Sequence, residues 1–209
     1  MNFNNANDAF KVLYEKIHRK GKRIGNTMAL FNIGFNLINP EDNIIKTDWR
    51  KWNEDYAEYE WQWYLSGNPS GKEIAKKAKI WNNCMDELGN VNSNYGHHWK
   101  QGNQIEYVIN ELKNNPDSRR ASISIYDAKN RHNFERDTPC TYAINFSIYD
   151  DKLNMSVLMR SNDLWYGFCN DQYCFSKLQI RIAYALKKDV AQNLHLYNNF
   201  LNKDKNDKI

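Results

Sequence analysis

The chain has 209 residues, 41% of them hydrophobic, and a formal net charge of +4 at pH 7, which fits one domain over 1–209 and excludes a disordered chain. The small, scattered charge argues against direct nucleic-acid binding and suits a single anionic ligand. We find no signal peptide, no apolar run that could span a membrane, no CxxC pair and no zinc-ligand spacing, so we expect a cytoplasmic protein with reduced thiols and no metal.

The first half of the chain carries mainly helical patterns. Behind an expected Asp8 cap, Phe10, Leu13 and Ile17 lie on one face of a predicted helix. One stretch instead has apolar residues at every second position, which predicts a strand. The predicted ranges are 8–21 (helix), 27–37 (strand), 53–67 (helix ending at Gly67), 70–89 (helix) and 103–116 (helix).

The second half carries mainly strand patterns. Residues 140–160 predict a hairpin about a turn at Asp150–Asp151. Residues 171–188 are apolar nearly all round, as in a buried helix. Short strands are predicted at 120–127 and 193–198, and a loose tail at about 202–209. Because strands and helices do not alternate regularly, the sequence predicts the α+β class.

The hairpin brings a cysteine and an arginine together. Antiparallel partners about the 150–151 turn sum to about 301 in residue number, so Cys140 falls opposite Arg160 and Ser161. The guanidinium would favour the thiolate and lower the pKa of Cys140. A polar loop, 130–139, leads into this strand and could expose the thiol to a ligand. A small, buried cysteine without chemistry is the alternative.

Two further groups of residues suggest a phosphorylated sugar ligand. Arg119 and Arg120 suit a phosphate, but neighbours on a strand face opposite sides, so both serve one ligand only if the chain bends or a partner subunit contributes. Arg23 lies in a glycine-containing turn and is another phosphate candidate. His195 and Tyr197 share one strand face and could hold a sugar hydroxyl. Each of these residues could equally be a solvated surface group.

Seven segments occur in the same order as motifs of thymidylate synthase, from about Arg23 to Tyr197. They are "EYEWQWYLSG" (58–67), "NYGHHW" (94–99), "NPDSRR" (115–120), "TPC" (138–140), "RSND" (160–163), Gly167 and "HLY" (195–197). The chain therefore resembles the thymidylate synthase family. Within it, "NSNYG", "NPDSRR" and "MRSND" are most similar to phage deoxycytidylate hydroxymethylases, which make 5-hydroxymethyl-dCMP from dCMP and methylenetetrahydrofolate.

The resemblance implies a mostly antiparallel or mixed sheet packed by helices, a homodimer formed through the sheet, and 5,10-methylenetetrahydrofolate as co-substrate. Cys140 would add to C6 of the pyrimidine so that C5 takes the one-carbon unit, and Glu60 would act as acid or base. The implied contacts are Arg23, Arg160 and Ser161 with the phosphate, Arg119 and Arg120 with a neighbour's phosphate, His195 and Tyr197 with the ribose, Trp81 and Asp163 with folate, Tyr95 near the cysteine, and Gly167 in the nucleotide-binding loop.

Departures from the synthase pattern imply cytosine as the base. Asp171 replaces the asparagine that reads uracil, and an ionised carboxylate suits the N4 amino group and a protonated N3 while it repels uracil O4. Thr141 and Asn145 replace the usual histidine and glutamine. The chain stops soon after Tyr197, without the segment that seals the synthase site, and a more open site would let water attack the exocyclic methylene.

Together these features imply a dCMP 5-hydroxymethyltransferase in the cytosol of a bacterium or phage-infected host. Three alternatives stay open: a CMP hydroxymethylase of a nucleoside-antibiotic type of pathway, a dUMP-acting hydroxymethylase or thymidylate synthase, and a family member that binds nucleotide or nucleic acid without catalysis. The presence of Cys140, Glu60 and Arg160 argues against the last.

Overall fold

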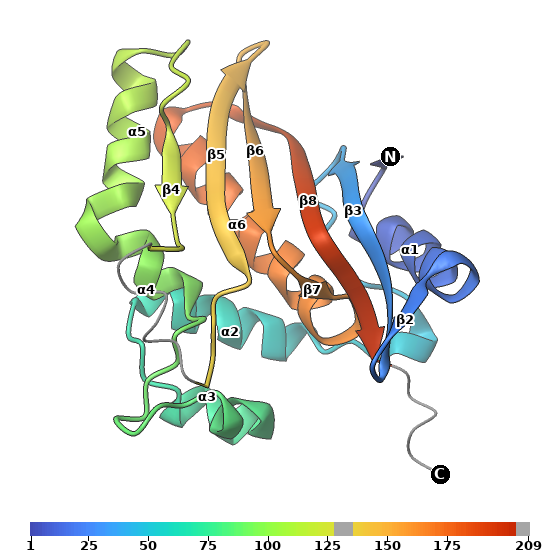
Figure 1. Cartoon of the computed structure of the whole chain (residues 1–209). Helices are drawn as coiled ribbons and strands as arrows, with labels where there is room; N and C mark the ends of the chain where they lie inside the picture. Colours follow the sequence, from blue (N-terminus) through green and yellow to red (C-terminus); the bar gives the residue numbers. More distant parts are fainter. Residues whose placement is uncertain (128–135, 204–209) are drawn as a thin grey trace.

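A mixed sheet forms the centre of this computed structural model, which describes residues 1–127 and 136–203 (Figure 1). Its main path runs β1 (Asn2–Phe3), β3 (Thr27–Leu37), β8 (Asp189–Lys203), β6 (Lys152–Met159), β5 (Thr141–Tyr149) and β4 (Ser122–Ser124), with β2 (Lys22–Ile24) on β3 and β7 (Asn162–Asp163) on β8. The pairs β1–β3, β6–β8 and β7–β8 are parallel, and the other pairs are antiparallel. The predicted α+β class with a mixed sheet is confirmed.

Helices cover one face of this sheet, where α6 crosses behind the strands and α2 packs on α6 (Figure 1). The buried apolar side chains form one contiguous cluster between these layers. The helices are α1 (Ala6–Lys20), α2 (Glu54–Ser66), α3 (Lys72–Lys77), α4 (Tyr95–Lys100), α5 (Gln104–Asn114) and α6 (Cys169–Leu186), with short 3₁₀ turns η1 (Asp48–Arg50), η2 (Lys79–Asn83) and η3 (Gln101–Asn103) and a π-helical turn η5 (Leu164–Phe168).

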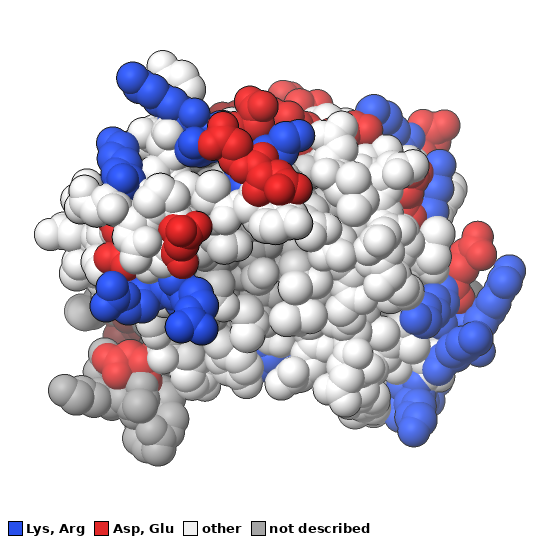
Figure 2. Space-filling model, turned by 90° about the horizontal axis from the view of Figure 1, so that it is seen from above, with Lys and Arg blue, Asp and Glu red and all other residues white. Residues whose placement is uncertain are grey.

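The other face of the sheet, called here the open sheet face, is covered by no described helix (Figure 1). One row of residues across it runs from Ser122 through Asn145, Ser156 and Leu194 to Asn36. All five are uncharged, and each is exposed or half-buried, whereas their strand neighbours point into the core. Figure 2 looks along the strands and not onto the open sheet face, and in this view charged side chains gather toward the edges of the molecule.

The β5–β6 hairpin has the predicted register. Pairs from Ala143–Leu158 to Tyr149–Lys152 sum to 301, and a bulge near the start of β5 then brings Thr141 opposite Met159. The turn residues Asp150 and Asp151 have φ of 49° and 61°, as a two-residue type I′ turn requires and as aspartate tolerates. This register places Cys140 directly across from Arg160, as predicted.

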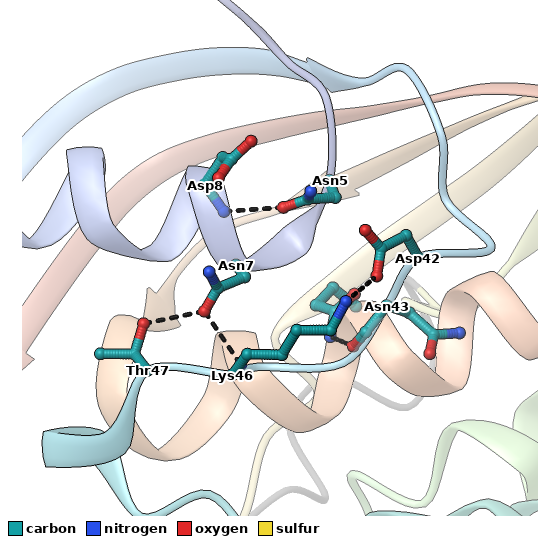
Figure 3. A network of polar contacts seen from close by, with 8 residues as sticks. Asn5, Asn7, Asp8, Asp42, Asn43, Lys46 and Thr47 are labelled. Atoms are coloured by element: carbon teal, nitrogen blue, oxygen red, sulfur yellow. Dashed lines mark hydrogen bonds and ion pairs between the residues drawn. The ribbon is translucent and has the colours of Figure 1, made fainter.

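A polar network fixes the N-terminus of α1 (Figure 3). The cap is Asn5, whose Oδ1 accepts from the backbone N–H of Asp8 at 2.9 Å, so the expected Asp8 cap is wrong. Asp8 instead lies in the first turn, where a negative charge suits the helix dipole. Asn7 accepts from the Lys46 N–H at 2.9 Å and from the Thr47 hydroxyl at 2.8 Å, which ties the loop before η1 to α1.

Some element boundaries differ from the predictions. The single helix expected at 70–89 is broken because Ala78 is extended and the Asp86 carboxylate accepts from the N–H groups of Leu88 and Asn90, which closes a turn. The strand expected at 193–198 extends to Asp189–Lys203 because two long strands pair with it. Asn202 and Lys203 are therefore not tail, while 204–209 and part of the polar loop, 128–135, lie outside the described residues.

Candidate active site

A cavity of about 310 Å³ opens beside the N-terminal end of α6. Five residues expected at the site line it: Glu60, Trp81, Tyr95, Gly167 and Asp171. The remaining lining residues are Tyr56, Tyr64, Ala78, Ile80, Cys84, Ser93, Tyr166 and Asn170. Five of the thirteen lining residues are aromatic, and two buried carboxyl groups lie among them.

A close approach of two helices shapes one wall. A Cβ on Gly96 would lie 1.9 Å from the Tyr64 carbonyl oxygen, so only glycine lets α4 pack this tightly against α2. The Tyr64 and Tyr95 rings then lie with centroids 5.7 Å apart. Tyr95 lies near enough to Cys140 and Asp171 for their charges to raise its pKa, so α4 brings a hydroxyl between the expected nucleophile and the base-reading carboxyl.

Glu60 projects from α2 into the cavity and is only 4% exposed. The Tyr64 hydroxyl donates to Glu60 Oε1 at 2.9 Å. Burial raises the pKa of Glu60 to about 6, although hydrogen bonds from Tyr64 and Tyr56 act in the opposite direction. A carboxyl with a pKa near neutrality can both take up and release a proton, as an acid/base group must.

Asp171 lies in the first turn of α6 and is 8% exposed. Burial raises its pKa well above the usual range, the charges of Glu60 and Asp163 raise it further, and a hydrogen bond with Asn162 opposes the rise. The sequence suggested an ionised carboxylate here. The structure favours the protonated form in the protein without ligand, because two other carboxyls and a low-dielectric setting disfavour a third negative charge.

Close packing around Asp171 requires a glycine at position 167. A Cβ at this position would lie 2.2 Å from Asn162 Oδ1 and 3.4 Å from Asp171 Oδ2. Any side chain would therefore displace Asn162, which is buried and contacts the Asp171 carboxyl. The glycine keeps this carboxyl accessible from the cavity, which it also lines.

Cys140 and Arg160 pair at the start of the hairpin. The Arg160 N–H donates to the Cys140 carbonyl at 2.8 Å, while its guanidinium donates to the carbonyls of Pro139 at 3.1 Å and Thr138 at 2.8 Å. The expected lowering of the thiol pKa is wrong for the protein without ligand. Burial raises the pKa of Cys140 to about 11, and the attraction of Arg160 only partly offsets it.

The expected folate residues lie at the rim. The Trp81 indole N–H donates to the Tyr56 hydroxyl at 2.8 Å, and its ring packs edge-on against Trp63. Asp163 Oδ1 accepts from the N–H groups of Trp165 and Tyr166 at 2.8 and 2.7 Å. Asp163 therefore caps the π-helical turn η5, which presents the exposed Tyr166 ring to the cavity.

Comparison with known proteins matches residues 8–206 to the family model described as thymidylate synthase. The chain belongs to the thymidylate synthase family. It is 35% identical to deoxycytidylate 5-hydroxymethyltransferase of Enterobacteria phage T4 over 133 residues, 60% of this chain and 54% of that protein. It is 30% identical to thymidylate synthase of Buchnera aphidicola subsp. Acyrthosiphon pisum (strain APS) over 158 residues, 68% of this chain and 60% of that protein. The chain thus spans just over half the length of these curated relatives.

Cys140, Arg160, Asp163 and several other residues that the family resemblance suggested do not line the cavity. Tyr197 and His195 share a face, as predicted, and the Tyr197 hydroxyl lies 2.8 Å from His195 Nδ1. Both are almost fully buried, and burial lowers the pKa of His195 to about 3, so its ring is neutral. Arg23 is exposed on β2, Ser161 is half-buried after β6, and Asn145 is exposed on the open sheet face.

The arginine pair lies at the opposite end of the sheet. Ser122 pairs with Asn145, so Arg120 lies level with Ser147, seven positions along β5 from Cys140. At about 3.3 Å per residue this is a separation of about 23 Å. The Arg120 side chain is 76% exposed and contacts Glu111 at 3.4 Å. Neither Arg119 nor Arg120 can therefore reach the cavity of its own subunit.

The sequence did not single out several cavity residues. Tyr56 and Tyr64 stand four positions before and after Glu60, a helical spacing that places all three on one face and could have identified them. Cys84 had a weaker case than Cys140 because its sequence setting is apolar, yet it lines the cavity and is half-buried. Tyr166 and Asn170 follow the recognised "RSND" segment and gave no separate signal.

Two expected absences concern only the part of the chain that the structure describes. Within 1–127 and 136–203, no helix combines the length and apolar character needed to cross a membrane. In the same residues, no three His, Cys, Asp or Glu side chains gather closely enough to hold a metal ion.

Proposed function

We propose that this protein transfers a one-carbon unit from 5,10-methylenetetrahydrofolate to C5 of dCMP and adds water, which gives 5-hydroxymethyl-dCMP. The observation that carries the proposal is the Asp171 carboxyl, buried in the cavity with Glu60 and near Cys140. The phage T4 relative is named as an enzyme of this type. Cytidylate carries a ring nitrogen that a protonated carboxyl can recognise.

Asp171 would read the base through its proton. A protonated carboxyl donates to the N3 lone pair of cytosine and accepts from the N4 amino group. As a thiolate adds to C6, this proton can pass to N3 and neutralise the developing charge. Uracil already carries a proton on N3, so it cannot take a proton there. A protonated carboxyl can still pair with uracil by accepting from N3–H and donating to O4. The preference for cytosine therefore rests on proton transfer to N3 and not on the hydrogen-bond pattern alone.

Cys140 would be the nucleophile that attacks C6. Burial favours the protonated thiol, so its proton must pass to a water molecule as the S–C6 bond forms, and neighbouring Arg160 favours the thiolate. Among the described residues, two N–H groups of the Arg160 side chain donate to the loop, and a guanidinium has five. Free donors beside Ser161 suit the nucleotide phosphate.

Glu60 would activate water. After C5 takes the one-carbon unit, loss of the C5 proton and of tetrahydrofolate leaves an exocyclic methylene. Water adds to this methylene, the Cys140 thiolate leaves C6 as the C5–C6 double bond re-forms, and a nearby base must take the water proton. Glu60 has a pKa near neutrality for this step and lines the same cavity. The aromatic walls formed by Trp81 and Tyr166 suit the planar pterin of the folate, which supplies the carbon.

The active unit would be a homodimer formed through the open sheet face. A second row across this face runs through Ser124, Ala143, Leu158, Leu196 and Gly34, again without charge. Small, uncharged side chains let two flat surfaces meet closely without burying an unpaired charge. The partner could then bring Arg119 and Arg120 to the phosphate, which neither arginine reaches within one subunit.

Methylation of dUMP is the second candidate. The thymidylate synthase of Buchnera aphidicola aligns over 158 residues, against 133 for the phage enzyme. The two candidates share the nucleophile and the folate, so base preference and product separate them. We would incubate the protein with methylenetetrahydrofolate and dCMP, CMP or dUMP in turn and weigh the nucleotide products. Hydroxymethyl-dCMP supports the proposal, and methylated dUMP as the main product contradicts it.

A further inference from the structure

We propose that Tyr56 and Tyr64 are positioning residues that hold one edge of the Glu60 carboxylate and link it to Trp81. The catalytic consequence rests on the proposed role of Glu60, whereas the positioning itself is a property of the folded chain. All four side chains line the cavity.

The spacing on α2 creates this arrangement. Tyr56, Glu60 and Tyr64 follow one another at intervals of four residues, so their side chains lie one above the other on one helix face. The Tyr64 hydroxyl donates to Glu60 Oε1 at 2.9 Å. A carboxylate can only accept, so the direction of this hydrogen bond is fixed.

The second tyrosine is oriented by Trp81. An indole N–H can only donate, so in the 2.8 Å contact between Trp81 and Tyr56 the hydroxyl oxygen accepts. The hydroxyl hydrogen of Tyr56 is then available for Glu60, and a hydrogen bond from Tyr56 lowers the pKa of this carboxyl. A continuous path of polar contacts thus runs from the expected folate residue to the acid/base group.

The two carboxylate oxygens are not equivalent. Oε1 accepts from Tyr64, whereas Oε2 is buried and has no hydrogen-bond partner among the described residues. A buried carboxylate oxygen without a partner is costly unless a water or ligand satisfies it. The tyrosines therefore fix one edge of Glu60 and leave the other for the reacting water.

The titratable groups around Glu60 come from α2, α4 and α6, and Cys84 and Tyr166 add two more from the turns that line the same cavity. Asp171 and Cys174 face it from α6, and their pKa values are raised by its charge. Tyr95 approaches from α4 and lines the same cavity. The hydroxyls of Tyr56 and Tyr64 have strongly raised pKa values, so both stay neutral donors. Among the described residues, these two hydroxyls are the groups that lower the pKa of Glu60.

The test compares Tyr64→Phe, Tyr56→Phe and the double variant with Tyr173→Phe. Tyr173 is a matched control, because its buried hydroxyl donates at 2.7 Å to Glu58 on the same helix but outside the cavity. Glutamate side-chain carboxyls would be labelled with ¹³C and titrated by NMR in the protein without ligands, and Glu60→Gln would assign the Glu60 signal.

We expect the pKa of Glu60 to rise by roughly one pH unit in Tyr64→Phe, because a hydrogen bond to the charged form is lost. The pKa of Glu60 should rise further in the double variant, and it should be unchanged in Tyr173→Phe. A Glu60 pKa that stays the same or falls in the double variant overturns the proposal. This readout needs no substrate, so it holds even if the proposed reaction is wrong.

Kinetics then test the catalytic consequence with dCMP and methylenetetrahydrofolate. We expect kcat of Tyr64→Phe to fall by roughly tenfold, with a nearly unchanged KM for dCMP. The limb of the pH–rate profile that reports Glu60 should move to higher pH with its pKa. A moved NMR titration with an unmoved limb refutes the acid/base role of Glu60 and leaves the positioning intact.

Discussion

The two faces of the sheet differ in where charged residues lie. On the helix side, Glu60 and Asp171 are buried in one cavity, and both have raised pKa values. On the open sheet face, the rows through Ser156 and Leu158 contain no charged residue. Burying a carboxyl costs stability and is retained where chemistry needs it, whereas a neutral, small-residue face suits contact with another surface. The difference fits the proposed reaction site on the helix side and the proposed dimer contact on the open sheet face.

The largest expected effect is on the helix side. Cys140→Ser should lower kcat for dCMP by at least ~10³-fold, because a hydroxyl is a far weaker nucleophile than a thiolate. Cys174→Ala is the control, since Cys174 is fully buried in the core. Single-turnover kinetics with both variants make the measurement. Near-normal turnover by Cys140→Ser would show that Cys140 is not the nucleophile.

Glu60→Gln should lower kcat by roughly 10²-fold, because the amide cannot take the water proton. The variant should also lose the limb of the pH–rate profile near the Glu60 pKa of about 6. A profile recorded from acidic to alkaline pH checks both points. An unchanged limb in Glu60→Gln would assign it to another group.

The same variant should be more stable than wild type at alkaline pH. The pKa of Glu60 is about 6 in the folded protein against 4.5 for a free side chain, so the folded state loses stability as pH rises through this range. The loss at pH 8 is about 2 kcal/mol. Urea unfolding should show Glu60→Gln gaining about this much at pH 8 and almost nothing near pH 4.5. An equal gain at both values would contradict a buried, titrating carboxyl.

The open sheet face should respond to charge in a different way. Ser156→Lys, in the middle of this face, should weaken self-association at least ~10-fold while each subunit stays folded, because a lysine would be buried without a partner. Ser66→Lys, in the last turn of α2 and off the sheet, is the control. Sedimentation and circular dichroism make the comparison. A wild-type protein that is active as a monomer would rule out this use of the face.

Mixing two inactive variants tests the same surface with a smaller expected effect. Hybrids of Arg120→Ala with Cys140→Ala subunits should recover part of the wild-type activity, because one of the two sites regains both residues. Theory limits the recovery to about a quarter of the wild-type rate when subunits mix randomly. Activity measured against mixing ratio is the readout. No recovery despite proven subunit exchange would place Arg120 outside the neighbour's site.

Local sequence patterns predicted those parts of the fold that depend on near neighbours. The hairpin register follows from one turn and correctly placed Cys140 across from Arg160. The break after α3 depends on the Asp86 turn and was missed because the apolar spacing continues through it. The spacing of apolar residues and the turn residues therefore predicted the structure where both agree. They failed after α3, where the apolar spacing favours a continuous helix and the Asp86 turn ends it.

The identities of several site residues could be predicted from the sequence, but their burial and pKa values could not. Glu60, Trp81 and Asp171 were expected and do meet in one cavity. The high pKa of Cys140 was not expected, because it depends on burial by segments distant in the sequence. Cys84 was missed for the same reason. Strand register can show which charged residue lies beside another residue. The burial of a side chain depends on the packing of the whole fold, so the sequence does not show it.

The central claim is that Asp171 selects cytosine, and the ratio of kcat/KM for dCMP to that for dUMP tests it most directly. A site that pairs a buried polar group can reject the wrong partner by as much as ~10⁴-fold. We expect wild type to prefer dCMP and Asp171→Asn to lose much of this preference, because an amide has no proton to pass to N3. Full inversion is not required, since Thr141 and Asn145 also differ from the synthase pattern. A wild type that prefers dUMP, or a ratio that the substitution leaves unchanged, would contradict the account.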